Sequence, residues 1–237
     1  MIRVVIFDFD DTLIDNRVSD YQGFLIPCIR LGLPLPTVRE IYCFRKKGLL
    51  AKDIAKHILN YSEKYFLLDR FLSIRRNFIN GTNSNRYFRL KKQTKLLLKF
   101  LKRKEIKCFI CSVRKNRKLV HGFLKNEKIL KYFKEINLAG DLSFDIKNNT
   151  PLKRALIKSS LIRKIMKDYS LKPDEVVYVG NAKEDIKSGL NTRVKFVFYK
   201  NSYMPNLPEL NLQNIIKVTN MNGLREKIDN FLKDRPY

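Results

Sequence analysis

The sequence predicts an α/β fold built on a doubly wound parallel sheet, with an all-helical insert after the first strand. Short apolar runs alternate with segments of helical periodicity, which is typical of parallel strands connected by crossover helices. Residues 16–85 show helical patterns and no strand-like alternation, which indicates the insert. We therefore expect an α/β core domain of residues 1–15 and 86–237, and a helical domain of residues 16–85.

The first predicted strand is an apolar run that begins at Val4 and leads directly into Asp8. Such a run is typical of a parallel strand buried on both faces. If the strand continues to Asp10, the two carboxylates face the same side, about 6–7 Å apart. Ligands bind beyond the carboxyl ends of strands in open α/β sheets, so two acids here suit a nucleophile and a proton donor. The alternative is that these acids merely end a strand and start a turn.

The insert contains several helical patterns and ends in a polar loop. Apolar residues recur at helical spacing in the segments 21–29, 38–44, 54–65 and 71–78. The polar segment 80–85 favours a loop or hinge through which the chain returns to the core. Arg45, Lys46 and Lys47 are candidates for substrate contacts, although most such side chains are simply solvated.

The second part of the core repeats the alternation of strand and helix. We expect strands at 106–111, 135–139, 176–179, 194–199 and 215–218. The helices between them are expected at 90–101, 119–130, 158–169, 185–190 and 224–232. Strands alternating with helices in this way give a parallel sheet with helices on both faces.

Composition argues against a membrane protein and leaves the choice of anionic partner open. No apolar run approaches the ~20 residues of a membrane span. The apolar start is too short for a signal peptide, so a cytoplasmic protein is expected. The formal net charge of +26 favours anionic substrates or nucleic acid. The charge is spread along the chain, however, as a Lys-rich composition would also produce.

Cys108 and Cys111 form a CxxC pair, the spacing found in redox and zinc motifs. Because the pair lies in an apolar, strand-like run, its two members should face opposite sides of the sheet. The sequence contains no second CxxC, and His57 and His121 are far apart. Buried structural thiols are therefore the favoured interpretation.

Polar residues follow three of the predicted strands. Asp8 and Asp10 follow the first, Ser112 follows the second, and Asn181 follows a later one, with Asp185 four residues beyond. The carboxyl ends of parallel strands share one edge of a sheet, so these side chains should converge. Carboxylate, amide and carbonyl oxygens suit Mg²⁺, which prefers oxygen ligands and retains water. A metal ion together with a lysine can neutralise a phosphoryl group that a carboxylate attacks.

The motifs resemble those of the haloacid dehalogenase superfamily and occur in the same order. The first, DxDxT, matches residues 8–12, and the second, a Ser or Thr at a strand end, matches Ser112. The third, a lysine, matches Lys158, with Lys153 as the other candidate. The fourth, GDxxxD after an apolar strand, matches residues 180–185. The resemblance spans essentially the whole chain and implies a Rossmann-like core with a C1-type helical cap.

The resemblance also implies a Mg²⁺-dependent phosphohydrolase acting on a phosphorylated small molecule. Asp8 would be the nucleophile that forms an aspartyl-phosphate. Asp10 would act as general acid and then base, and its backbone carbonyl would bind Mg²⁺. Ser112 and Lys158 would bind the phosphoryl oxygens, and Asp185 would complete the magnesium shell directly or through water. The acid at Asp10 argues against the dehalogenase branch, which works without metal.

Asn181 departs from the family, which usually has Asp at this position. Its amide oxygen can still ligate Mg²⁺, but one negative charge is lost, so weaker metal affinity is expected. Two alternatives stay open: a phosphomutase that uses the same residues, or a catalytically weak protein that binds nucleic acid or protein through its basic surface. The sequence does not determine the substrate or the oligomeric state.

Overall fold

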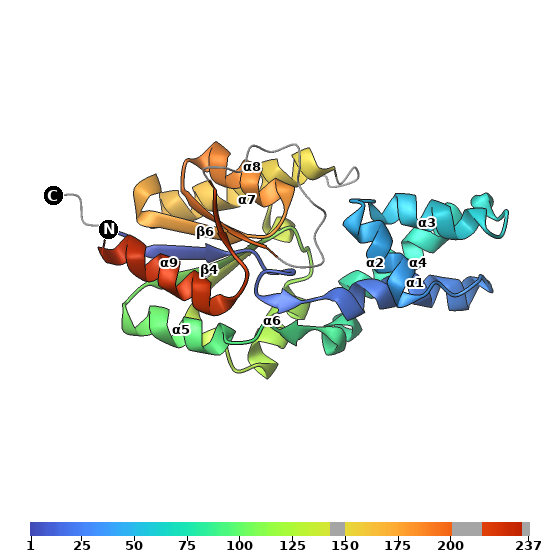
Figure 1. Cartoon of the computed structure of the whole chain (residues 1–237), viewed down its shortest axis with the longest axis horizontal. Helices are drawn as coiled ribbons and strands as arrows, with labels where there is room; N and C mark the ends of the chain where they lie inside the picture. Colours follow the sequence, from blue (N-terminus) through green and yellow to red (C-terminus); the bar gives the residue numbers. More distant parts are fainter. Residues whose placement is uncertain (143–149, 201–214, 234–237) are drawn as a thin grey trace. The chain divides into compact units, whose positions relative to one another are not determined.

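The computed structural model describes residues 1–142, 150–200 and 215–233. Contacts divide the described chain into two compact units (Figure 1). The core unit contains residues 1–15 and the described residues from Arg89 onward, and the helical unit contains residues 16–88. The parts of the predicted core domain at 143–149, 201–214 and 234–237 lie outside the described residues.

A six-stranded parallel sheet forms the centre of the core unit in the described part of the chain. In spatial order its strands are β5 (Phe133–Leu138), β4 (Lys107–Ser112), β1 (Val4–Phe7), β6 (Val176–Gly180), β7 (Lys195–Tyr199) and β8 (Ile216–Val218). The direction in which strands are added reverses between β1 and β6, the place where ligands bind in doubly wound sheets. The predicted doubly wound parallel sheet is confirmed.

Helices cover both faces of this sheet (Figure 1). They are α5 (Thr94–Arg103), α6 (Arg117–Asn126), α7 (Pro151–Asp168), α8 (Lys183–Thr192) and α9 (Met221–Lys233). Val4 and Ile6 of β1 pack in one cluster with Leu161 and Ile165 of α7. The alternate residues of β1 are buried as well, since both faces are covered. Burial on both faces explains why the strands appear in the sequence as continuous apolar runs.

The core unit also contains several short elements. An antiparallel pair, β2 (Ile14–Asp15) and β3 (Arg89–Leu90), joins the two places where the chain leaves and re-enters this unit. Single turns of 3₁₀ helix are η3 (Leu130–Tyr132), η4 (Ala139–Asp141) and η5 (Pro173–Glu175).

Several predicted boundaries in the core are wrong. The helix predicted at 90–101 begins at Thr94, with Leu90 in β3, and the helix predicted at 119–130 ends at Asn126. Two further differences lie near the site. Strand β1 ends at Phe7, so Asp8 and Asp10 follow the strand in a turn and are not successive same-face residues of it. Helix α7 begins at Pro151, not at 158, because Thr150 caps it by accepting a hydrogen bond from Lys153 N. The sequence pattern did not indicate the first turns of α7, because some of their apolar side chains are exposed to solvent and form no clear apolar stripe.

The cysteines behave as buried structural thiols, except for the exposed Cys43. Cys111 lies in the same cluster as Phe109, on the α7 side of the sheet, and burial raises the pKa of Cys108 to about 12. All four cysteines are free thiols. The CxxC spacing is therefore part of a buried strand, as expected.

The helical unit is held together by an apolar core and one buried ion network. Its helices are α1 (Arg17–Leu31), α2 (Val38–Lys46), α3 (Ala51–Asn60) and α4 (Leu68–Asn80), with 3₁₀ turns η1 (Tyr65–Leu67) and η2 (Thr82–Tyr87). The predicted loop at 80–85 thus contains the last residue of α4 and most of η2. Phe24, Ile41, Ile54 and Phe71 are among the fully buried residues of this unit's core.

Asp20 of α1 forms ion pairs with arginine side chains of two other helices. Arg45 of α2 binds both of its oxygens, at 2.8 and 2.7 Å, and Arg75 of α4 binds Oδ1 at 2.6 Å. Burial alone would raise the pKa of Asp20, but the two guanidinium groups outweigh it and lower the pKa to about 2. Arg45, a predicted substrate contact, is thus tied into the packing of the helical unit.

We predict that Asp20→Asn destabilises the protein by about 3–5 kcal/mol at pH 7, because two buried arginines lose their counter-ion. The depressed pKa contributes about 2 kcal/mol in the wild type, present above the unfolded-state pKa and lost as pH falls from about 4 to 2. Urea denaturation at pH 7 and pH 3 measures both effects. Asp69→Asn, an exposed acid of α4, is the matched control, and an equal loss in both variants would contradict the prediction.

Candidate active site

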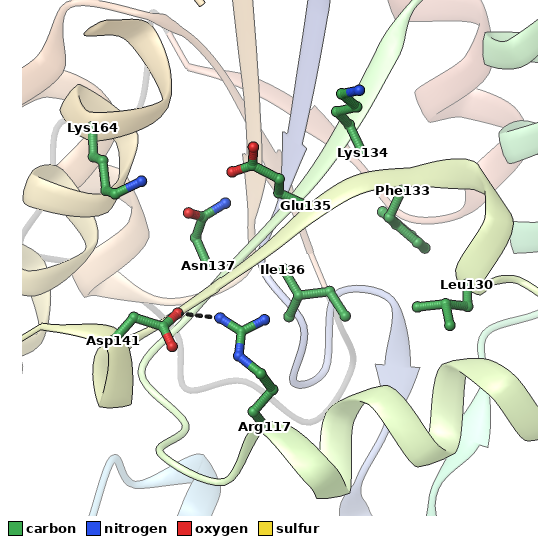
Figure 2. A pocket seen from close by; sticks show the side chains of 9 residues that line it. All are labelled: Arg117, Leu130, Phe133, Lys134, Glu135, Ile136, Asn137, Asp141 and Lys164. Atoms are coloured by element: carbon green, nitrogen blue, oxygen red, sulfur yellow. Dashed lines mark hydrogen bonds and ion pairs between the residues drawn. The ribbon is translucent and has the colours of Figure 1, made fainter. Parts of the chain in front are cut away.

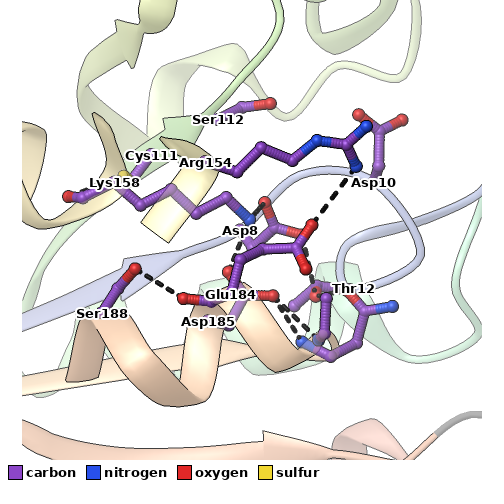
Figure 3. Close-up of polar contacts among 12 residues, drawn as sticks. Asp8, Asp10, Thr12, Cys111, Ser112, Arg154, Lys158, Glu184, Asp185 and Ser188 are labelled. Atoms are coloured by element: carbon purple, nitrogen blue, oxygen red, sulfur yellow. Dashed lines mark hydrogen bonds and ion pairs between the residues drawn. The ribbon is translucent and has the colours of Figure 1, made fainter. Parts of the chain in front are cut away.

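A buried ion cluster lies at the carboxyl end of β1. Lys158 of α7 donates from Nζ to Asp8 Oδ1 at 2.7 Å and to Asp185 Oδ1 at 2.5 Å (Figure 3). All three side chains are at most 5% exposed. Two carboxylates and one ammonium therefore share a site from which water is largely excluded. Lys158 makes this contact from the middle of its helix, whereas Lys153 lies in the first turn.

Burial and charge act on this cluster in opposite directions. Burial is the strongest influence on Asp8 and raises its pKa well above the usual range, with Asp185 and Asp10 adding to the effect and Lys158 opposing it. For Lys158, burial alone lowers the pKa, but the charges of Asp185 and Asp8 outweigh it and raise the pKa. The lysine therefore stays an ammonium, and its charge is what allows the two carboxylates to be buried.

The start of α8 fixes Asp185. Its Oδ2 accepts hydrogen bonds from the backbone N–H groups of Asn181, at 3.0 Å, and Ala182, at 2.9 Å. Its Oδ1 accepts from Lys158 and from the hydroxyl of Tyr178. These four donors satisfy the carboxylate, so a place for Asp185 in a magnesium shell would require one donor to leave.

Gly180 allows this close packing. A Cβ atom on Gly180 would lie 2.4 Å from the Cβ and Cγ atoms of Asp185, which is closer than any real contact. The glycine of the fourth motif is therefore needed for the approach of Asp185 to the strand end.

Asn181 follows β6 and faces the other side of Asp8. The inner atom of its side-chain amide lies 3.2 Å from Asp8 Oδ2 and 3.0 Å from both Asp10 O and Thr12 Oγ1. With its oxygen inward, the amide accepts from Thr12 Oγ1 and joins two further oxygens in a donor set that suits a cation; with its nitrogen inward, it can donate to two of the three oxygens. Thr12 Oγ1 in turn donates to Asp8 Oδ2 at 3.3 Å.

Arg114 connects Asp10 with the end of β4. Its guanidinium binds Asp10 through Nε–Oδ2 at 2.8 Å and Nη2–Oδ1 at 2.7 Å, and its backbone N–H donates to Ser112 Oγ at 3.3 Å. Ser112 is buried, whereas the Asp10 side chain is 26% exposed. The structure thus brings the predicted residues together in two linked groups, one around Asp8 and one around Arg114.

The sequence reasoning missed three residues of this site. They are Arg114, which holds Asp10, Thr12, which contacts Asp8, and Tyr178, which contacts Asp185. Thr12 is part of the DxDxT motif, and Arg114 lies two residues after Ser112, so the motifs could have indicated both residues. Tyr178 gave no signal, because an aromatic residue within a buried strand is typical of a core.

The oxygens nearest to the Asn181 amide suit a weakly held Mg²⁺. They are Asp8 Oδ2 and the backbone carbonyl of Asp10. Mg²⁺ often takes one or two carboxylates and keeps several waters, which fits this small set. No group of three or more His, Cys, Asp and Glu side chains placed to hold a metal occurs in the described ranges.

A separate pocket of about 530 Å³ lies along the edge strand β5 (Figure 2). Glu135 and Asn137 of β5 line it together with Lys164 of α7. Arg117 and Asp141, also in its lining, form an ion pair at 2.6 Å. The pocket includes none of the predicted site residues, so the candidate site rests on the polar cluster and not on this cavity.

We predict that Lys158→Met destabilises the protein by about 3–5 kcal/mol at pH 7, because two buried carboxylates lose their cation. Burial already raises the pKa of Asp8, and the loss of the Lys158 charge removes the main opposing influence, so stability should rise as pH falls toward about 5. Urea denaturation at pH 8 and pH 5.5 measures the difference. Lys153→Met, in the same helix, should cost at most about 0.5 kcal/mol, and equal losses would contradict the assignment.

No helix in the described part of the chain combines the length and apolarity of a membrane span. No curated protein matches the chain. Among solved structures, a subfamily IA hydrolase of the haloacid dehalogenase superfamily from Geobacter sulfurreducens matches with a TM-score of 0.72 at 16% identity, covering 97% of this chain and 96% of that one.

Two further structures share the fold. A predicted phosphoglycolate phosphatase from Haemophilus somnus matches with a TM-score of 0.73 at 18% identity, over 96% of this chain and 98% of that one. A β-phosphoglucomutase from Clostridium difficile matches with a TM-score of 0.63 at 18% identity, over 99% and 98%. The family model described as haloacid dehalogenase-like hydrolase matches residues 5–199. With its sheet and its motifs in that family's order, the chain belongs to the haloacid dehalogenase-like hydrolases.

Proposed function

We propose that the protein is a Mg²⁺-dependent phosphohydrolase that cleaves a phosphomonoester through an aspartyl-phosphate on Asp8. The observation that carries this proposal is the buried Asp8–Lys158–Asp185 cluster at the end of β1. It fixes one carboxylate beside one cation, as a phosphoryl acceptor requires. Family membership supports the proposal, as does the fold shared with a predicted phosphoglycolate phosphatase.

The two oxygens of Asp8 have different surroundings, which suggests different roles. Oδ1 lies beside the Lys158 ammonium, whereas Oδ2 faces Asn181, Thr12 and the carbonyl of Asp10. We assign the attack on phosphorus to Oδ1. Lys158 donates two of its three protons to Asp8 and Asp185, so the third can bind a phosphoryl oxygen. The Ser112 hydroxyl, which accepts from the Arg114 N–H, keeps its own proton for a second phosphoryl oxygen.

In the first step, the bond from Asp8 Oδ1 to phosphorus forms as the ester P–O bond breaks, and the leaving oxygen takes a proton from Asp10. In the second step, water attacks the phosphorus, Asp10 takes a proton from it, and Asp8 leaves as inorganic phosphate forms. Because Arg114 donates to both oxygens of Asp10, one of these bonds must open and Asp10 must take a proton from solvent before it can donate. The freed guanidinium is then available to the anionic substrate.

Mg²⁺, when bound, would neutralise charge on the phosphoryl group. Asp8 and the Asp10 carbonyl would hold it, with waters and the substrate completing the shell. We also propose that the helical unit, residues 16–88, is the cap that selects the substrate and excludes water. The cytoplasmic location stays a prediction.

We predict that the wild type hydrolyses p-nitrophenyl phosphate with Mg²⁺ and that Asp8→Asn lowers kcat by about 10³-fold or more, because the nucleophile is lost. Inorganic phosphate release measures the rate and also separates hydrolysis from the transfer that a mutase performs. Asp11→Asn is the matched control: Asp11 has a φ of 56°, a conformation that Asn also tolerates. A wild type no faster than Asp8→Asn would refute the proposal.

We predict that Arg114→Gln lowers kcat for an alkyl phosphate about tenfold more than for p-nitrophenyl phosphate. Arg114 positions Asp10, and only the poor alkyl leaving group depends strongly on its proton. The ratio of the two kcat values is the measurement. Arg117→Gln, which removes an arginine outside the site, should leave it unchanged. Equal losses on both substrates would show that Arg114 does not act through Asp10.

A further inference from the structure

Asn137 of β5 carries a buried amide nitrogen without a hydrogen-bond partner. The residue is 5% exposed, and its Nδ2 atom is buried and unpaired among the residues that the structure describes. Buried polar groups are nearly always hydrogen-bonded, because an unpaired donor loses its bonds to water and gains nothing in return. An apolar side chain would fill this position in the strand without that loss. The amide therefore needs an acceptor that the packing of the strand does not supply.

The side chain of Asn137 lines the pocket of about 530 Å³ beside β5 (Figure 2). A volume of this size is in the range of small-molecule sites, which are largely apolar and contain a few placed polar groups. Leu130, Phe133 and Ile136 provide the apolar part of this lining. The unpaired amide thus lies at a cavity that a small molecule can enter.

The charges around the pocket favour an anion. Three cationic side chains line it: Arg117, Lys134 and Lys164. Its two acids, Glu135 and Asp141, already accept hydrogen bonds, the first from the Tyr169 hydroxyl at 2.5 Å and the second from the Arg117 guanidinium at 2.6 Å. A cationic ligand would therefore meet three like charges and two acids that are already engaged, whereas an anion would be attracted.

Lys164 of α7 is the cation that can turn to such an anion most easily. Its ion pair with Asp168 of the same helix lies at the surface, with side chains 50% and 41% exposed, and pairs of this kind contribute little stability. The hydrogen bond to Asp168 raises the pKa of Lys164, and the charges of Glu135 and Asp141 act in the same direction. The ammonium is thus within electrostatic reach of the other charged groups of the pocket.

We propose that the pocket along β5 binds a small molecule with a carboxylate or phosphate group, which accepts hydrogen bonds from Asn137 Nδ2 and Lys164. The apolar part of this molecule lies against Phe133 and Ile136. An ionised acceptor suits both donors, since charge-assisted hydrogen bonds are stronger than neutral ones. This binding site contains none of the residues assigned to phosphoryl transfer, and the inference does not depend on the proposed function.

Nuclear magnetic resonance titration of the ¹⁵N-labelled full-length chain tests this, with benzoate and phenylphosphonate as probes that share a ring and differ in the acidic group. At least one probe should shift the side-chain amide signals of Asn137 until they saturate. The backbone amide signal of Ile136 then gives the affinity in each variant. Asn137→Leu and Lys164→Met should each lower it about tenfold, the effect of losing a hydrogen bond to a charged group. The exposed controls Asn191→Leu and Lys167→Met should leave it unchanged.

Saturation with benzoate alone, with phenylphosphonate alone or with both supports the proposal and identifies the acidic group. Because the Asn137 signals report on the pocket itself, a probe bound at the candidate active site is not mistaken for this binding. Absence of a saturable shift with either probe would overturn the proposal, as would unchanged affinity in both Asn137→Leu and Lys164→Met. If Asn137→Leu does not fold, the exposed Lys164→Met decides alone: affinity equal to that of Lys167→Met overturns the proposal.

Discussion

The ion pairs of Lys158 with Asp8 and Asp185 are the interaction on which the rest of the site depends. Burying either carboxylate alone would cost several kcal/mol, so both acids need the one ammonium that α7 places between them. Lys158 thereby connects the end of β1 with the start of α8, and Gly180 leaves room for Asp185 to reach it. Because β1 lies beside β6 in the sheet, the residues that follow these two strands are close together.

Around this cluster, Asp8 has a cationic side and a neutral side. The Lys158 ammonium lies beside Oδ1, and the uncharged side chains of Asn181 and Thr12 lie beside Oδ2. Arg114 adds a second cation, which forms an ion pair with Asp10 in this structure. Within the site, positive charge therefore lies beside Asp8 and Asp10, and Asn181 is the position that departs from the family pattern.

Much of the fold could be predicted because buried parallel strands have a local signal. The runs at β1 and β6 are apolar throughout, since helices cover both faces, and each ends in the polar residue that the site uses. The sequence pattern does not predict where an element begins or ends when packing, and not periodicity, decides that boundary. Helix α7 starts earlier than predicted because Thr150 and Pro151 begin it while its first turns expose apolar side chains. The segment 80–85 is polar, yet it continues as a 3₁₀ turn.

The sequence by itself determined the fold class and the set of residues at the strand ends, because strand periodicity and motif spacing are local properties of the chain. Only the tertiary structure decided their partners. Asp10 and Arg114 are 104 residues apart, and Asp8 and Lys158 are 150 apart, so no spacing pattern links them. The Asn181 side chain likewise lies among oxygens of Asp8, Asp10 and Thr12 that only the folded chain brings around it. A residue type states which hydrogen bonds a side chain can make, and the surrounding atoms decide which of them it makes.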